Sequence, residues 1–189
     1  MATARPVLAI LADQHLTPTG SAWVGSAVTG DAAASLLYFA KWCAAHRCPG
    51  AGAGDLFDKA TNRSRVLALA RESLAPFANA HDRPFFHVKG NHDADDPPWM
   101  TFVPGTEYAH GRVGMVGPFT VYALDYTPRE DLAAALARIP PGTDVLIAHQ
   151  AWAEWNKNPG AAQGHLKDVP EVRYVFSGDD HVTRADTIE

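Results

Sequence analysis

The sequence has few cysteines and no long apolar run. Its two cysteines, Cys43 and Cys48, form a single C-x4-C pair. Without a second pair they do not make a zinc site, and they predict two reduced thiols in an intracellular protein. No apolar run approaches the roughly 18 residues that cross a bilayer, and the apolar residues 7–12 are too few for a secretory signal. We therefore expect a cytoplasmic protein that does not contact a membrane.

The sequence also lacks a large excess of charge of either sign. It has 21 acidic and 16 basic residues, a formal net charge of −5. Proteins that follow a nucleic-acid backbone usually carry a basic patch, and the composition does not indicate one. Bound cations would neutralise some carboxylates, so charge alone does not exclude a nucleic-acid substrate. The apolar fraction of 47% is enough for a core, and residues 1–189 fit one catalytic domain.

Apolar patterns predict strands that alternate with helices. Short apolar runs predict the strands, and apolar residues at helical spacing predict the helices. The expected strands are residues 7–12, 51–53, 85–88, 112–116, 119–124, 144–148 and 174–176; the expected helices are residues 32–46, 64–80 and 129–138. Such alternation is typical of a layered α/β fold.

Polar residues that can bind metals follow these strands. They are Asp13 and His15, then Asp55, then Asn91 and His92, then His149, and finally Asp179 and His181. Ligands bind at the carboxyl ends of strands in open α/β sheets, because several loops converge there. Oxygen and imidazole ligands without a thiolate favour Mn²⁺, Fe or Zn²⁺. Two such ions need a bridging carboxylate, and Asp55 is the best placed candidate.

Five short motifs resemble those of the calcineurin-like metallophosphoesterase family. They are D-x-H at 13–15, G-D-x-x-D at 54–58, G-N-H-D at 90–93, a separate His149, and G-D-D-H at 178–181 where the family usually has G-H-x-H. The resemblance implies an α/β, layered αββα sandwich with mixed sheets and a dinuclear metal site at the carboxyl ends of the strands. It also implies metal-dependent hydrolysis of phosphate esters.

The resemblance further assigns roles to individual residues. It implies one metal on Asp13, His15 and His181, a second on Asn91, His149 and Asp179, and Asp55 bridging the two. A metal-bridging hydroxide would attack phosphorus, because two cations lower the pKa of bound water. His92 would assist the leaving group, oriented by the carboxylate of Asp58.

Asp179 departs from the family pattern. If the last motif is extended, Asp179 and His181 share a face and Asp180 points away, so we expect Asp179 to be a ligand. A carboxylate there makes the second metal position harder, which favours Mn²⁺ or Mg²⁺ over Zn²⁺. We expect Mn²⁺. The alternative is that Asp179 leaves the second position weak.

The motifs leave the substrate open between three classes. The strings G-D-L-F-D at 54–58 and L-I-A-H-Q at 146–150 are similar to the nuclease subunit of the double-strand-break repair complex, and Lys59 replaces the arginine of protein phosphatases. We therefore favour a phosphodiesterase or nuclease-like enzyme, acting on a phosphate ester such as nucleic acid or a nucleotide. The alternatives are a small phosphomonoesterase or nucleotide hydrolase, and a binding module without catalysis. The sequence gives no support for a partner ATPase subunit.

Three tryptophans could contribute to substrate binding. Trp99, Trp152 and Trp155 follow the predicted metal-binding motifs on loops. They could stack on a base or line an apolar pocket. The alternative is that they cover the core.

Overall fold

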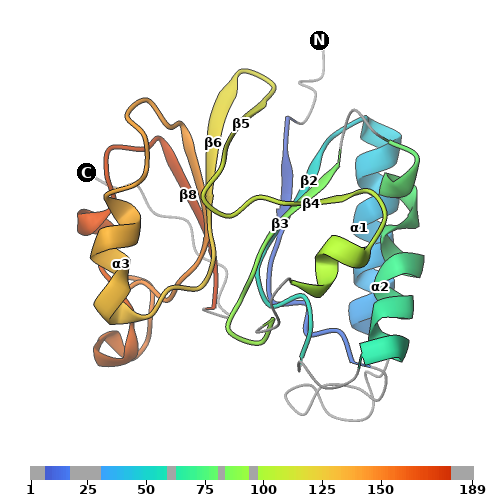
Figure 1. Cartoon of the computed structure of the whole chain (residues 1–189), viewed down its shortest axis with the longest axis horizontal. Helices are drawn as coiled ribbons and strands as arrows, with labels where there is room; N and C mark the ends of the chain where they lie inside the picture. The colour runs from blue at the N-terminus through green and yellow to red at the C-terminus, as the bar shows by residue number, and fades with distance from the viewer. Residues whose placement is uncertain (1–6, 18–30, 59–62, 81–83, 94–97, 180–189) are drawn as a thin grey trace.

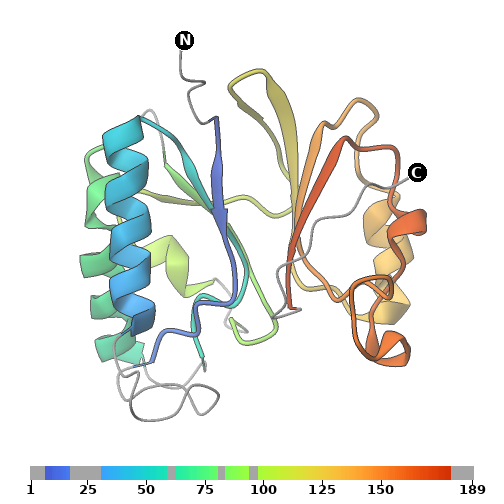
Figure 2. The same ribbon diagram turned by 180° about the vertical axis from the view of Figure 1, so that it is seen from behind.

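Two β-sheets face each other and carry helices on their outer faces (Figures 1 and 2). A computed structural model describes residues 7–17, 31–58, 63–80, 84–93 and 98–179. The first sheet has the order β1 (Ala9–Leu11), β2 (Gly50–Ala53), β3 (Phe85–Val88), β4 (Thr106–Tyr108); the second has β5 (Val113–Val116), β6 (Phe119–Leu124), β7 (Val145–His149), β8 (Tyr174–Gly178). This arrangement confirms the predicted layered α/β fold.

The connections between strands explain their directions. α1 (Asp31–His46) joins β1 to β2, α2 (Arg63–Ala78) joins β2 to β3, and the short η2 (Trp99–Phe102) precedes β4. A crossover of this kind returns the chain to the same end of the sheet, so neighbouring strands run parallel, and the first sheet is parallel throughout. The second sheet is mixed, as predicted, because β5 and β6 form an antiparallel pair.

Alternation along β7 produces two apolar layers. Leu146 and Ala148 pack against α3 (Arg129–Leu136), whereas Val145 and Ile147 pack between the sheets against Ala51 and Ala53 of β2. Side chains of a strand point to opposite faces in turn, so a strand buried on both sides is apolar throughout. β7 therefore contributes both to the core beneath α3 and to the core between the two sheets.

A third core lies between the first sheet and its two helices. α1 contributes Leu36, Ala40 and Cys43, and α2 contributes residues at the predicted helical spacing. β2 is Gly-Ala-Gly-Ala, which is a weak strand signal by sequence. A Cβ at Gly50 would lie 2.7 Å from the Phe77 ring. The small residues of β2 therefore make room for aromatic rings of the core.

Most predicted elements are confirmed, with shifts at their ends. The strands at 85–88 and 119–124 have the predicted bounds, while β7 includes His149 and α3 ends earlier than predicted. The prediction missed β4, which has only three residues, and, among the described residues, three short 3-10 helices: η2, η3 (Pro159–Ala161) and η4 (Leu166–Asp168).

Both cysteines are buried free thiols. Among the described residues, no helix has the length and hydropathy needed to cross a membrane.

Candidate metal centre

The first two candidate ligands lie on a loop with left-handed backbone conformations. Asp13 and His15 have φ of 54° and 46°, so this segment is not extended. Hydrogen bonds to the neighbouring loop cause this path: the N–H groups of Asp13 and His15 donate to the carbonyls of Gly54 and Asp55, at 3.1 and 3.0 Å. Asp13 and His15 still converge, and each places a ligand atom within 4.8 Å of Asp55.

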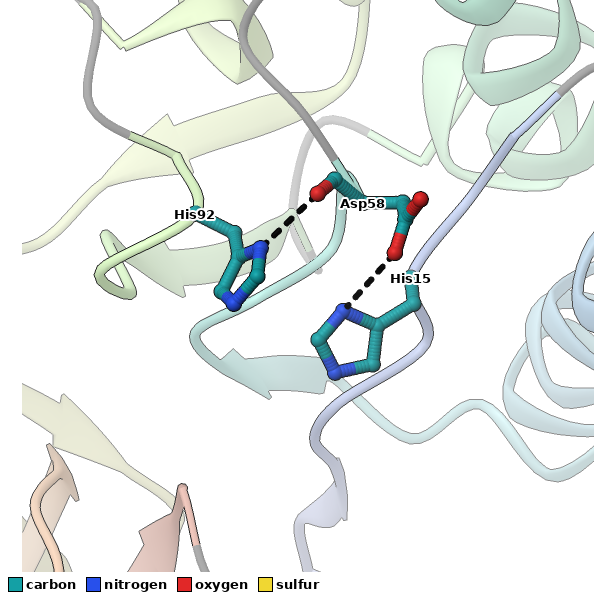
Figure 3. A group of neighbouring side chains, drawn as sticks. All are labelled: His15, Asp58 and His92. Carbon is teal, nitrogen blue, oxygen red and sulfur yellow. Dashed lines mark hydrogen bonds and ion pairs between the residues drawn. The ribbon is translucent and has the colours of Figure 1, made fainter. Parts of the chain in front are cut away.

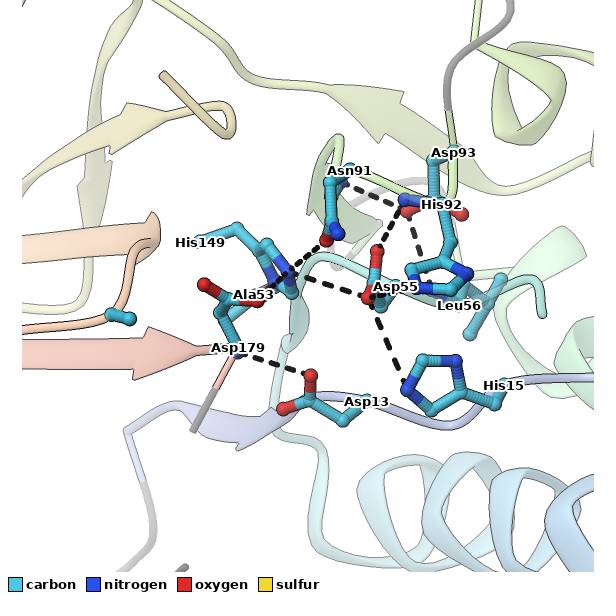
Figure 4. A network of polar contacts seen from close by, with 12 residues as sticks. Asp13, His15, Ala53, Asp55, Leu56, Asn91, His92, Asp93, His149 and Asp179 are labelled. Atoms are coloured by element: carbon cyan, nitrogen blue, oxygen red, sulfur yellow. Dashed lines mark hydrogen bonds and ion pairs between the residues drawn. The ribbon is translucent and has the colours of Figure 1, made fainter. Parts of the chain in front are cut away.

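The carboxylate of Asp55 lies at the centre of the cluster (Figure 4). Its Oδ2 is 3.4 Å from Nε2 of His149 and 3.9 Å from Nε2 of both His15 and His92. Its Oδ1 accepts a hydrogen bond from the main-chain N–H of His92 at 2.9 Å. Asp55 is 2% exposed. Three imidazoles, two from loops and one from the end of β7, therefore face one buried oxygen.

Main-chain carbonyls fix the orientation of two of these imidazoles. Nδ1 of His149 donates to the carbonyl of Ala53 at 2.8 Å, and Nδ1 of His92 donates to the carbonyl of Asp58 at 2.8 Å. A carbonyl oxygen only accepts, so the proton must be on Nδ1 and Nε2 is the nitrogen directed at Asp55. Histidines that bind metals are commonly oriented in this way.

Asp58 holds His92 by a different atom from the one predicted (Figure 3). The resemblance implied a carboxylate partner for His92, but the partner in the structure is the main-chain carbonyl of Asp58. Its carboxylate is 3.8 Å from Nδ1 of His15 instead. The N–H of Asp58 donates to the carbonyl of Leu16, which brings Asp58 against the first loop. Asp58 therefore contacts both His15 and His92.

The remaining candidate ligands surround His149. Nε2 of His149 is 3.1 Å from Oδ1 of Asn91 and 3.7 Å from Oδ1 of Asp179. The N–H of Asp179 donates to Asp13 at 3.0 Å, which joins the last loop to the first. Asp179 has a φ of 79°, so its position results from a turn and not from the alternation that we expected. Asp180 and the predicted ligand His181 lie outside the described residues.

Charges at the centre favour a cation. Burial acts to raise the pKa of Asp55, but His149 and His92 hold that pKa below its ordinary value. Burial likewise opposes the charge of His149, yet Asp55, the carbonyl of Ala53 and Asp13 raise its pKa to about 9. The cluster therefore stabilises positive charge in spite of burial.

The donor atoms fit a divalent metal. Two overlapping groups have ligand atoms within 4.8 Å of one another: Asp13, His15 and Asp55, and His15, Asp58 and His92. They offer oxygen and imidazole nitrogen, the donors that suit Mn²⁺, Fe and Zn²⁺. His149, oriented by a carbonyl and surrounded by carboxylates, extends the same donor set.

Comparison with known proteins identifies the family. Residues 52–183 match the calcineurin-like phosphoesterase family, which covers more than half of the chain. The chain belongs to the calcineurin-like phosphoesterases. The activity of this family is metal-dependent hydrolysis of phosphate esters. The two observed sheets agree with the layered α/β fold of the family. A comparison with curated proteins returned no match.

The family match begins after the first motif. Asp13 and His15 precede residue 52, so the sequence match does not include them. The structure brings both beside Asp55 of the matched region. Asp13 and His15 therefore join the candidate site on geometric grounds.

Asp93 is the last residue of the G-N-H-D motif, and the sequence alone assigns it no role. The carboxylate of Asp93 accepts hydrogen bonds from the N–H groups of Leu56, Phe57 and Gly90, at 3.3, 3.0 and 3.0 Å. Burial raises its pKa to about 6, against the effect of these donors. Asp93 therefore joins the loop of Asp55 to the loop of Asn91 and His92.

Glycines permit the close approach of these loops. A Cβ at Gly90 would lie 2.0 Å from Oδ1 of Asp55, and a Cβ at Gly54 would lie 2.4 Å from Nδ1 of His149. Real Cβ atoms do not approach so closely, so the candidate ligands Asp55 and His149 occupy space that only glycine leaves open.

The tryptophans do not support the prediction of a stacking surface. Trp152 is 0% exposed within the core between β7 and α3, and Trp155 packs against the same core. Trp99 packs on Phe57, with ring centroids 5.4 Å apart. These rings cover the core, as the alternative held. Among the described aromatic side chains, Tyr126 lies near the centre, with its ring centroid 6.4 Å from that of His149.

Proposed function

We propose that this phosphoesterase is a phosphodiesterase with nuclease-like activity, acting on a nucleic acid or a nucleotide. The observation that carries the proposal is the third carboxylate of the centre. Asp179 approaches His149 to 3.7 Å, and its N–H group is bonded to Asp13. The family pattern has a neutral imidazole at this position, so Asp179 makes the site less positive than is usual for the family.

The charge of the site bears on the charge of the substrate. Two divalent cations bring four positive charges, and the carboxylates of Asp13, Asp55 and Asp179 cancel three of them. A phosphodiester carries one negative charge and brings the sum of the ions, these three carboxylates and the substrate to zero. A phosphomonoester carries two near neutral pH and leaves it negative, which costs free energy in a partly buried site. The site therefore favours a diester.

The proposed ligand sets follow the family pattern. Asp13, His15 and His181 would hold one ion; Asn91, His149 and Asp179 would hold the other; Asp55 would bridge them. Carboxylate and amide oxygens dominate the second set, which favours Mn²⁺ or Mg²⁺ over Zn²⁺ there. When bound, the ions supply Lewis-acid charge for the phosphate and a low pKa for the attacking water.

His92 is suited to meet the leaving oxygen. Its side chain is 34% exposed, whereas those of His15 and His149 are 9% and 0% exposed. With Nδ1 donating to Asp58, Nε2 is the ring nitrogen that remains to meet a substrate, and it lies beside Asp55. A proton on that nitrogen can pass to the departing alkoxide. Asp58 keeps the ring in place through its carbonyl.

Two further observations support a nucleic-acid or nucleotide ester. The nearby ring of Tyr126 offers an aromatic surface beside the centre, on which a base could stack. At the position after Asp58, Lys59 stands where the protein phosphatases have an arginine. Both fit an internal phosphodiester better than a phosphorylated protein.

Hydrolysis of bis-p-nitrophenyl phosphate and of p-nitrophenyl phosphate tests the proposal. Each is measured with Mn²⁺, Mg²⁺ and Zn²⁺, and Asp55→Asn is the inactive control. We expect Mn²⁺ to support the highest rate and the diester to be preferred. Preference for the monoester would favour the alternative, a small phosphomonoesterase. No turnover of either ester with any of the metals would favour a binding module.

Two further measurements sharpen the result. Labelled single- and double-stranded DNA of one sequence distinguishes a nuclease from an enzyme that cuts only small diesters. Asp179→His tests the charge argument, because it removes one negative charge from the site. It should shift the substrate preference toward the monoester and the metal preference toward Zn²⁺. An unchanged substrate ratio and an unchanged metal preference in Asp179→His would remove the basis of the proposal.

A further inference from the structure

Asp125 is a buried carboxylate at the junction of the two sheets. It directly follows β6 of the second sheet and is 6% exposed. Its Oδ1 accepts the main-chain N–H of Lys89 at 2.7 Å, and its Oδ2 accepts the hydroxyl of Tyr108. Both donors belong to the first sheet or to the loop that follows it. The side chain of Asp125 therefore crosses from one sheet to the other.

The main chain around Asp125 completes the junction. Its carbonyl accepts the side-chain amide of Gln150 at 3.0 Å, and the N–H of Tyr126 donates to the carbonyl of Lys89 at 2.7 Å. Both main-chain groups of Lys89 are thus held by two adjacent residues at the end of β6. Gln150 is 0% exposed, so this link is shielded from water.

These links end beside two candidate ligands. Lys89 stands two residues before Asn91, and Gln150 directly follows His149. Asn91 comes from the first sheet and His149 from the second, yet their side chains lie 3.1 Å apart. Hydrogen bonds within a sheet set the register of its own strands, but they do not set the spacing between two packed sheets. Contacts between the sheets must therefore hold these two ligands at their distance, and the links of Asp125 are among them.

We propose that Asp125 is a positioning residue that holds the Asn91 loop and the end of β7 at His149 at metal-binding distance. It acts through Lys89 on one side and through Gln150 on the other. The inference rests on the ligand set proposed above for the second ion. It concerns the arrangement of this chain's own residues and can be measured without turnover.

Mn²⁺ binding, measured by titration calorimetry, tests the inference with Asp125→Ala and Asp125→Asn. Asp125→Ala removes the acceptor of the Lys89 N–H, and we expect Mn²⁺ affinity to fall about tenfold or more, as when the partners of metal ligands are removed. Asp125→Asn keeps an acceptor oxygen at the same position and should recover most of the affinity. Equal loss in both variants would contradict a role through Lys89.

Asp144→Ala is a matched control. The carboxylate of Asp144 accepts the N–H of Thr120 at 2.8 Å, a link of the same kind within the second sheet alone. We expect Asp144→Ala to lower the melting temperature but to leave Mn²⁺ affinity within about twofold of the wild type. If Asp144→Ala weakens Mn²⁺ binding as much as Asp125→Ala does, the effect is general destabilisation and the inference is wrong.

A second variant covers the case in which Asp125→Ala does not fold. Gln150→Met keeps the buried volume but removes the link to the carbonyl of Asp125, and it should also weaken Mn²⁺ binding several-fold. Nitrogen resonances of the His149 ring, recorded without added metal, should shift in Gln150→Met and not in Asp144→Ala. Unchanged affinity and unchanged resonances would overturn the inference. A wild type that binds Mn²⁺ but cuts no ester would refute only the proposed function.

Discussion

His87 should make the protein sensitive to acid. Its side chain lies on β3, 4% exposed, with its ring centroid 5.5 Å from that of Tyr108. Within the described part of the chain, Nε2 of His87 has no hydrogen-bond partner. Burial therefore lowers the pKa of His87 from 6.5 to about 3. The folded protein keeps this imidazole neutral at a pH where the unfolded chain would protonate it.

The sign and size of the effect follow from linkage. The pKa of His87 is lower in the folded state, so its contribution to stability is fully present above pH 6.5 and is lost as pH falls toward 3. Each pH unit in that window changes the free energy of unfolding by about 1.4 kcal/mol. Between pH 7.5 and pH 5, where the unfolded chain gains the proton and the folded protein does not, the loss is about 2 kcal/mol.

His87→Phe isolates this contribution. Phenylalanine keeps an aromatic ring of similar size against Tyr108 and removes the titration. Urea unfolding at pH 7.5 and pH 5 gives the free energy of unfolding at each pH. The variant should lose about 2 kcal/mol less than the wild type over this interval. Equal pH dependence in His87→Phe and the wild type would refute the reasoning.

Three further predictions have defined outcomes. Gly90→Ala places a Cβ 2.0 Å from Oδ1 of Asp55 and should abolish Mn²⁺ binding in calorimetry. Its control is Gly114→Ala, whose Cβ meets open space, and this variant should bind Mn²⁺ as the wild type does. Asp93→Ala leaves three main-chain donors without their acceptor and should lower the free energy of unfolding by at least about 3 kcal/mol in urea. Trp152→Phe should lower stability yet leave the KM for bis-p-nitrophenyl phosphate unchanged, because Trp152 is a core residue; a raised KM would return it to the substrate site.

Local sequence patterns were enough to predict most of the elements. The apolar run that becomes β7 and the helical spacing of Leu36, Ala40 and Cys43 predict elements that the structure confirms. These signals depend on which side chains must be buried, and burial repeats with the period of the strand or helix. The three-residue β4 was missed because it shows too little of that period.

The position of Asp125 can also be read from the sequence. Asp125 follows Leu124 at the end of a predicted strand, as Asp55 and Asn91 follow theirs closely. It belongs to none of the five motifs, but it is a polar residue just beyond a buried strand, which is where loops converge.

The sequence by itself determined most of the strands and helices and the family to which the chain belongs. Only the tertiary structure decided which atoms meet. The left-handed turns at Asp13 and Asp179 and the carbonyl contact of Asp58 with His92 depend on hydrogen bonds between loops far apart in the chain. Such contacts leave no periodic trace in a sequence, because each joins loops that only the folded chain brings together.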